Sequence, residues 1–223
     1  MDLDHIRCDA LMGILEEDPS LSAHIFLRHG FSLGNLVGLT TGSSRLPLTA
    51  DGSESTIRFG RRTKALFGLG GWEVKSSAMY RSVQTISLLM GDDKSAISRD
   101  ARLNETNGGI CADIPRRWFD LLFPTHFAPS ESPSKKYPKG ESHNEMLLRV
   151  KDFTDEHCDS RRLFCCTHHG VLAAVIYWSA NEQLPNRMEQ IPFNHNIDHL
   201  GGLVALGPKG TGLKEKTLML MDW

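Results

Sequence analysis

The stretch His24-Ile25-Phe26-Leu27-Arg28-His29-Gly30 decides the fold, because an apolar run ends there on an arginine, a histidine and a glycine. The apolar run predicts a buried strand over residues 24–28. In open parallel sheets, ligands bind just beyond the carboxyl ends of the strands. Arg28 and His29 are therefore the first candidates for a functional site.

Two further places in the chain have polar residues directly after a predicted strand. Residues 77–81 follow a strand over 72–76, and residues 167–170 (Thr-His-His-Gly) follow a strand over 163–167. With Arg28 and His29, they supply two arginines and at least two histidines for one crevice. Such a set suits a tetrahedral dianion, because arginine presents a rigid fork of donors and a neutral imidazole can attack phosphorus.

The rest of the chain alternates helical and extended patterns. Helices are predicted over 9–17, 49–69, 80–90, 114–123, 142–156 and 171–179, and late strands over 200–206 and 217–221. The helix over 142–156 opens on a capping box, Ser142-x-x-Glu145. This alternation predicts a single α/β domain with a largely parallel sheet.

Composition restricts the class of protein. Among 223 residues, 25 Lys and Arg face 27 Asp and Glu, and the formal charge is −2 with ten histidines neutral. Nucleic-acid binding normally requires a basic excess, so we expect no nucleic-acid partner. No run of about 18 apolar residues occurs, which predicts no membrane span. The acidic N-terminus lacks a secretory pattern, and five cysteines without a C-x-x-C pair favour reduced thiols in a cytoplasmic protein.

Several short motifs, taken in order, carry a resemblance to a known family. They are Leu27-Arg28-His29-Gly30-x-Ser32-x-x-Asn35, Pro47-Leu48-Thr49-x-x-Gly52, the nonapeptide over 77–85, Leu103-x-Glu105-x-x-x-Gly109, Gly140-Glu141-Ser142 with Arg149, residues 167–171, and Pro192-x-Asn194-x-Asn196-Ile197. Their order and spacing resemble the histidine phosphatase superfamily, which has the RHG motif and includes phosphoglycerate mutases. The resemblance covers residues 24–206 and implies a three-layer α/β/α sandwich with a mostly parallel central sheet.

The resemblance also implies boundaries and residue roles. Residues 1–20 are expected to form an N-terminal extension and residues 21–223 the domain, with a loop and helix insertion over the active site at about 110–140. His29 is the expected nucleophile and Glu105 the general acid and base. The expected phosphoryl-binding residues are Arg28, Asn35, Arg81 and His168, and the expected substrate-binding residues are Ser32, His169 and Asn194.

His168 is assigned to the catalytic position, because only that register keeps Gly170-Val171 aligned with the family's "GV". Two arginines hold the phosphoryl charge, so we expect neither a metal nor a cofactor. The expected activity is hydrolysis of a phosphomonoester through phosphohistidine, on a small phosphorylated substrate or a phosphoprotein. The oligomeric state is left open.

Phe31 stands where many relatives have Glu or Gln, and this favours a phosphatase over the alternative, a phosphoglycerate mutase. A third alternative is an inactive phosphate-binding scaffold, although the expected pocket residues are all present. Cys165 and Cys166 precede two histidines, but neighbours on a strand point to opposite faces, so we predict buried thiols and not a zinc site. We expect Glu141 and Arg149 to form an ion pair.

Cations are frequent in the predicted insertion. They are Arg116, Arg117, Lys135, Lys136 and Lys139. Two hypotheses remain for them: a lid that binds additional negative charge of the substrate, or a solvated flexible loop.

Overall fold

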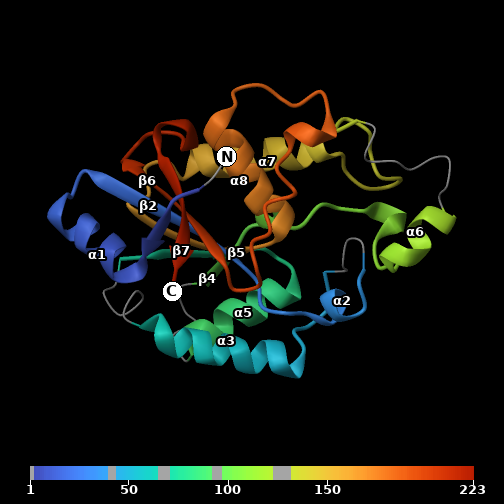
Figure 1. Cartoon of the computed structure of the whole chain (residues 1–223), viewed down its shortest axis with the longest axis horizontal. Helices are drawn as coiled ribbons and strands as arrows, with labels where there is room; N and C mark the ends of the chain where they lie inside the picture. The colour runs from blue at the N-terminus through green and yellow to red at the C-terminus, as the bar shows by residue number, and fades with distance from the viewer. Residues whose placement is uncertain (1–2, 40–43, 65–70, 92–96, 123–131) are drawn as a thin grey trace.

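A computed structural model of the chain describes residues 3–39, 44–64, 71–91, 97–122 and 132–223 (Figure 1). Within these ranges, seven strands form one sheet in the order β1-β7-β6-β2-β5-β3-β4. The strands are β1 (His5–Arg7), β2 (Leu21–Arg28), β3 (Glu73–Ser76), β4 (Ile97–Arg99), β5 (Arg162–Thr167), β6 (Gly202–Pro208) and β7 (Thr217–Asp222). β6 is antiparallel to both of its neighbours, and every other pair in the sheet is parallel.

The α-helices of the described ranges are α1 (Cys8–Glu17), α2 (Leu33–Leu36), α3 (Ala50–Arg62), α5 (Tyr80–Met90), α6 (Arg116–Leu122), α7 (His143–Glu156) and α8 (His169–Ala180). α1, α3, α5, α7 and α8 cover the two faces of the sheet. One core lies between α7, α8 and the sheet face that carries Phe26 and Cys165. The other lies between α1, α3, α5 and the face that carries Ile25 and Cys166. The predicted three-layer α/β/α sandwich is confirmed.

The two cores explain the apolar pattern of the strands. Neighbouring side chains on a strand point to opposite faces, and both faces are covered, so β2 and β5 are apolar almost throughout. Cys165 and Cys166 accordingly lie in different cores, both fully buried and both free thiols. The predicted buried thiol pair is confirmed.

Side-chain caps define the starts of α3 and α7, as the sequence indicates. Ser142 accepts from the backbone N–H of Glu145, whose carboxylate accepts from the N–H of Ser142, so the predicted capping box is present at α7. Thr49 caps α3 by accepting from the N–H of Gly52. α3 ends at Arg62, before the predicted end at residue 69, and residues 65–70 lie outside the described part of the chain.

The described residues expected to form the N-terminal extension join the sheet and one of its cores. β1 pairs in parallel with β7, and α1 buries Leu11 and Leu15 completely in the second core. The partner of β1 lies more than 200 residues later in the chain, and a strand of three residues has no recognisable pattern of its own. β4, also three residues long, is a second strand that the pattern does not predict.

The region predicted as an insertion contains α6 and the loop that leads into α7 (Figure 1). Leu39 and Pro115 form an isolated bridge, which joins the segment after α2 to the start of α6. Residues 123–131 of this region lie outside the described part of the chain. No described helix has both the length and the apolar composition to cross a bilayer.

Candidate active site

The sheet register brings the predicted site residues to one edge. Arg28, the last residue of β2, pairs with Thr167 of β5, and Ser76 of β3 pairs with Cys166. The residues that follow these three parallel strands therefore emerge side by side. His29 and His168 meet there, with ring centroids 5.0 Å apart.

His29 is buried and held in one tautomer. Its Nδ1 lies 2.7 Å from the carbonyl oxygen of Gly30, and a carbonyl can only accept, so Nδ1 carries the proton. Nε2 is then unprotonated, and its lone pair accepts a hydrogen bond from the Nε of Arg81 at 3.1 Å. Burial, and then the charge of Arg81, hold the pKa of His29 well below its ordinary value. The neutral ring presents the nitrogen that a nucleophile needs.

Two glycines let the loop after β2 approach α3 closely. A Cβ at Gly30 would lie 2.5 Å from Oγ1 of Thr56, and one at Gly52 would lie 2.1 Å from the carbonyl oxygen of Phe31. Both contacts are shorter than non-bonded atoms tolerate. The motif over 47–52 therefore supports the loop that carries His29.

His168 is the residue before α8 and is completely buried. Its Nε2 lies 2.7 Å from Oγ of Ser77 and 3.3 Å from Oγ of Ser82. Burial, followed by the charge of Arg81, lowers the pKa of His168 well below the ordinary value. Its Nδ1 is buried without a hydrogen-bond partner among the described residues.

The two arginines flank His29 from different elements. Arg28 donates from Nη1 to the carbonyl oxygen of Ile197 at 2.6 Å, and its buried Nε has no partner within the described structure. Arg81 lies in the first turn of α5 and is buried. Burial lowers the pKa of both guanidinium groups, and arginine nevertheless stays protonated in proteins. The two positive charges make this edge attractive to an anion.

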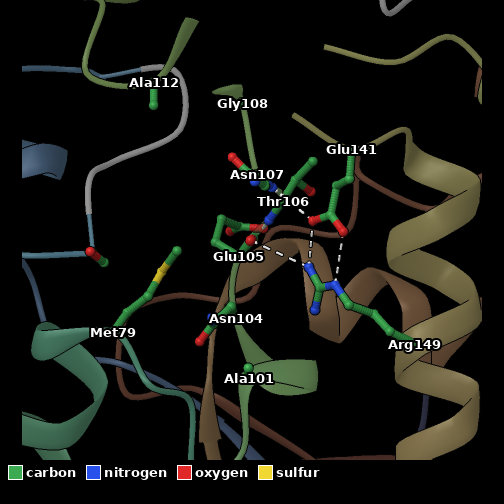
Figure 2. Close-up of a pocket in the computed structure, with 11 residues that line it drawn as sticks. Met79, Ala101, Asn104, Glu105, Thr106, Asn107, Gly108, Ala112, Glu141 and Arg149 are labelled. Carbon is green, nitrogen blue, oxygen red and sulfur yellow. Dashed lines mark hydrogen bonds and ion pairs between the residues drawn. The ribbon is translucent and has the colours of Figure 1, made fainter. Parts of the chain in front are cut away.

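The carboxylate of Glu105 contacts the first turn of α8. Its Oε2 accepts from the backbone N–H of Gly170 at 3.2 Å, and its Oε1 accepts from its neighbour Thr106 at 2.9 Å. A Cβ at Gly170 would approach Oε1 to 2.2 Å, so only glycine leaves room for the carboxylate. The predicted Glu141–Arg149 ion pair is present at 2.7 Å, and Arg149 also donates to the carbonyl oxygen of Glu105 at 3.3 Å (Figure 2).

A cavity of about 450 Å³ opens beside Glu105 (Figure 2). Its lining includes Met79, Asn104, Asn107, Glu141 and Arg149. His29 is not among the lining residues. The cavity is therefore lined by Glu105 and its neighbours and not by His29 itself.

The other predicted site residues make contacts outside the cluster of His29, His168 and the two arginines. Ser32 and Asn35 cap α2 together, with Oγ of Ser32 donating to Oδ1 of Asn35 at 2.7 Å, so a pocket contact from Asn35 has to come from its Nδ2. His169 points to the loop after α8, where its Nε2 donates to the carbonyl oxygen of His195 at 3.0 Å. Asn194 is an exposed residue of that same loop. The structure places His168, and not His169, against His29.

The described cations of the insertion do not gather at the cavity. Lys136 pairs with Glu145 at the start of α7, and Arg117 is exposed, with its guanidinium 5.9 Å from the ring of Trp118. Arg117, Lys135, Lys136 and Lys139 are not among the residues that line the cavity, and the side chain of Arg116 lies outside the described part of the structure. No group of three or more His, Cys, Asp or Glu that could hold a metal ion occurs in the described ranges.

Sequence reasoning missed His199. It lies in the turn before β6, and its ring centroid is 5.8 Å from that of His29. Burial, and next Arg28, lower its pKa to about 4. The one available signal was its position two residues after Ile197, at the end of the late asparagine motif.

Known proteins resemble this chain over most of its length. A family model described as the histidine phosphatase superfamily (branch 1) matches residues 24–201. The chain is 24% identical over 219 residues to 6-phosphofructo-2-kinase/fructose-2,6-bisphosphatase of Aquarana catesbeiana, covering 97% of the chain and 44% of that relative. It is 29% identical over 141 residues to the 2,3-bisphosphoglycerate-dependent phosphoglycerate mutase of Rhizobium etli, covering 60% of the chain and 66% of that relative. The chain thus spans less than half the length of the frog relative.

Solved structures share the fold. The alpha-ribazole phosphatase from Shigella flexneri superposes with a TM-score of 0.72 at 19% identity, covering 90% of this chain and 96% of that one. A mycobacterial glucosyl-3-phosphoglycerate phosphatase in complex with VO3 gives a TM-score of 0.71 at 18% identity, covering 91% and 98% of the two chains. At these identities the likeness concerns the fold.

Proposed function

The chain belongs to the histidine phosphatase superfamily, and from that premise we propose that it hydrolyses a phosphomonoester through a phosphohistidine at His29. The observation that carries the proposal is the tautomer of His29. Its Nδ1–H is fixed on the carbonyl of Gly30, so the Nε2 lone pair is available to attack phosphorus. Arg81 already donates to that nitrogen, at the place where a phosphoryl group would enter.

Two chemical steps follow from this arrangement. In the first, Nε2 of His29 forms a bond to phosphorus while the bond to the leaving oxygen breaks, and Glu105 gives that oxygen a proton. In the second, Glu105 takes a proton from water, whose oxygen attacks phosphorus and releases His29 and inorganic phosphate. Arg28, Arg81 and His168 stabilise the charge on the phosphoryl oxygens throughout.

The cavity beside Glu105 supports a small substrate with an uncharged leaving group. Among the described residues that line it, the arginine is Arg149, which is already paired with Glu141 and is thereby neutralised. Asn104 and Asn107 supply amide groups, which suit hydroxyl groups better than a second phosphate. The proposal therefore does not include a lid that binds additional negative charge, and it favours a small molecule over a phosphoprotein.

This substrate class is tested with two nearly isosteric compounds, glycerol 2-phosphate and 2-phosphoglycerate. We expect kcat/KM to be higher for the first, because the carboxylate of the second enters a cavity that contains Glu105 and Glu141. A preference for 2-phosphoglycerate would refute the assignment of an uncharged leaving group.

The nucleophile is tested with His29→Ala. We expect the variant to lose turnover of p-nitrophenyl phosphate and to trap no acid-labile phosphate, whereas the parent shows both. His5→Ala is the control, since His5 lies on the edge strand β1 and its exposed ring hydrogen-bonds to Asp222. Turnover at the parent rate in His29→Ala would overturn the proposal.

A mutase is the second candidate, because the relative from Rhizobium etli has that name. In a mutase, the phosphoryl group on His29 returns to the substrate and not to water. Incubation with 3-phosphoglycerate and a trace of 2,3-bisphosphoglycerate separates the two reactions. We expect inorganic phosphate and no 2-phosphoglycerate.

A further inference from the structure

His199 contacts both the proposed nucleophile and the residue that follows its motif. Its ring is tilted by 56° to that of His29, with centroids 5.8 Å apart. On Phe31 it packs edge to face, with centroids 5.1 Å apart and an angle of 85°. These two contacts fix the plane of the His199 ring beside the pocket of His29.

The turn that carries His199 is held tightly to the end of β2. The N–H of Leu200 donates to the carbonyl oxygen of Arg28 at 3.1 Å, and the N–H of Arg28 donates to Gly201 at 2.9 Å. Leu200 has a φ of +63°, which costs a residue with a side chain about 1 kcal/mol or more. A Cβ at Gly201 would lie 2.8 Å from the carbonyl oxygen of Asp198. This strained turn places the His199 ring beside His29, whereas Leu200 packs against the second core.

Three buried side-chain nitrogens around His29 lack a hydrogen-bond partner in the described structure: Nε of Arg28, Nδ1 of His168 and Nε2 of His199. A buried polar atom without a partner is unfavourable, and native proteins rarely leave several together. In the proposed function, Arg28 and His168 are two of the residues that bind the phosphoryl oxygens. A tetrahedral oxyanion, with its several acceptor oxygens, would provide partners for all three nitrogens at once.

We propose that His199 is a further phosphoryl-binding residue, whose buried Nε2–H donates to an oxygen of the group that His29 receives. This inference rests on the proposed function. Burial and the charge of Arg28 lower the pKa of His199 to about 4, so the ring is neutral at neutral pH and carries one N–H. His199 thus adds a donor to the pocket without adding a third full positive charge beside Arg28 and Arg81.

Orthovanadate, which adopts the geometry of phosphoryl transfer, is the probe, and its inhibition constant Ki is measured with p-nitrophenyl phosphate as substrate. His199→Phe keeps a ring against Phe31 and His29 but removes both nitrogens. We expect its Ki to rise about tenfold, which is equivalent to about 1.4 kcal/mol. His199→Gln keeps an N–H donor and is expected to retain a Ki within about threefold of the parent value.

His24→Gln is the matched control. His24 is buried, and like His199 it has a pKa of about 4 and an unpartnered ring nitrogen in the described structure, but it lies four residues before Arg28 in β2. The Ki of His24→Gln for orthovanadate is expected to equal that of the parent. A similar rise in Ki for His24→Gln would mean that losing any buried histidine loosens the pocket, and would overturn the inference.

A second measurement uses the unaltered protein, so it does not depend on the folding of a variant. In histidine-labelled protein, the Nε2 and attached proton resonances of His199 are expected to move when orthovanadate is added. Unmoved resonances, a parent Ki in His199→Phe, or an equal loss in the Phe and Gln variants would each overturn the inference. The proposed function fails separately, if His29→Ala keeps the parent turnover.

Discussion

Gly170→Ala tests the role of Glu105 without changing any titratable side chain. The added Cβ would lie 2.2 Å from Oε1 of Glu105, well inside the distance of about 3.5 Å at which non-bonded carbon contacts are optimal. The carboxylate therefore has to move by about 1 Å, and a displacement of that size can reduce a rate about 100-fold. Because the displaced atoms are the end of a side chain, we expect the fold to persist.

The assay compares kcat/KM for two phosphomonoesters. Glycerol 2-phosphate releases an alkoxide that requires a proton from Glu105, whereas p-nitrophenolate leaves without one. We expect a loss of about 100-fold for glycerol 2-phosphate, equivalent to about 2.7 kcal/mol in the barrier, and a loss of only a few-fold for p-nitrophenyl phosphate. kcat/KM is used because it reports the steps up to formation of the phosphoenzyme.

Gly13→Ala is the control for this experiment. Gly13 lies inside α1, and a Cβ there would meet nothing within 4 Å. The control is expected to keep parent kinetics and to gain about 0.5–1 kcal/mol of stability, because alanine is the better helix residue. Equal losses on both substrates in Gly170→Ala, or no loss on glycerol 2-phosphate, would refute the placement of Glu105 as the general acid.

Three further outcomes are expected. Histidine NMR should find His29 neutral at neutral pH, with its proton on Nδ1, because burial and the charge of Arg81 hold its pKa well below the ordinary value; a ring that titrates like an ordinary histidine would contradict this. Arg149→Met should lower the free energy of unfolding in urea by about 2 kcal/mol, because it leaves the half-buried Glu141 without its partner, and an unchanged midpoint would count against it. Burial lowers the pKa of His24 to about 4, so the unfolded chain binds the additional proton, and the free energy of unfolding should fall by up to about 3 kcal/mol between about pH 6.5 and pH 4; urea titrations of His24→Asn should fall less over the same range.

Local sequence patterns predict the structure correctly where the groups that contact a residue lie close to it in the chain. The capping box at Ser142 and Glu145 defines the start of α7 through backbone groups three residues apart. The apolar runs of β2 and β5 identify buried strands, because both faces of the sheet are covered. The spacing of Gly170 from His168 selected the histidine that the structure places beside His29.

Short elements with distant partners could not be predicted in this way. β1 has three residues, and it pairs with β7 at the other end of the chain. α1 has an apolar face, but nothing near it in sequence indicates that Leu11 and Leu15 are completely buried. The place of β1 and α1 in the sheet and the second core therefore has no signal in the local sequence.

The sequence by itself determined the fold class, the family resemblance and the chemistry of the residues at the strand ends, because these depend on periodicity and on the order of short motifs. Only the tertiary structure decided the tautomer of His29, the contact between Glu105 and Gly170, and the presence of His199 beside the nucleophile. Each of these depends on an atom-to-atom distance between segments far apart in the chain. Sheet register and the turn at Leu200 set those distances, and neither has a signature in the local sequence.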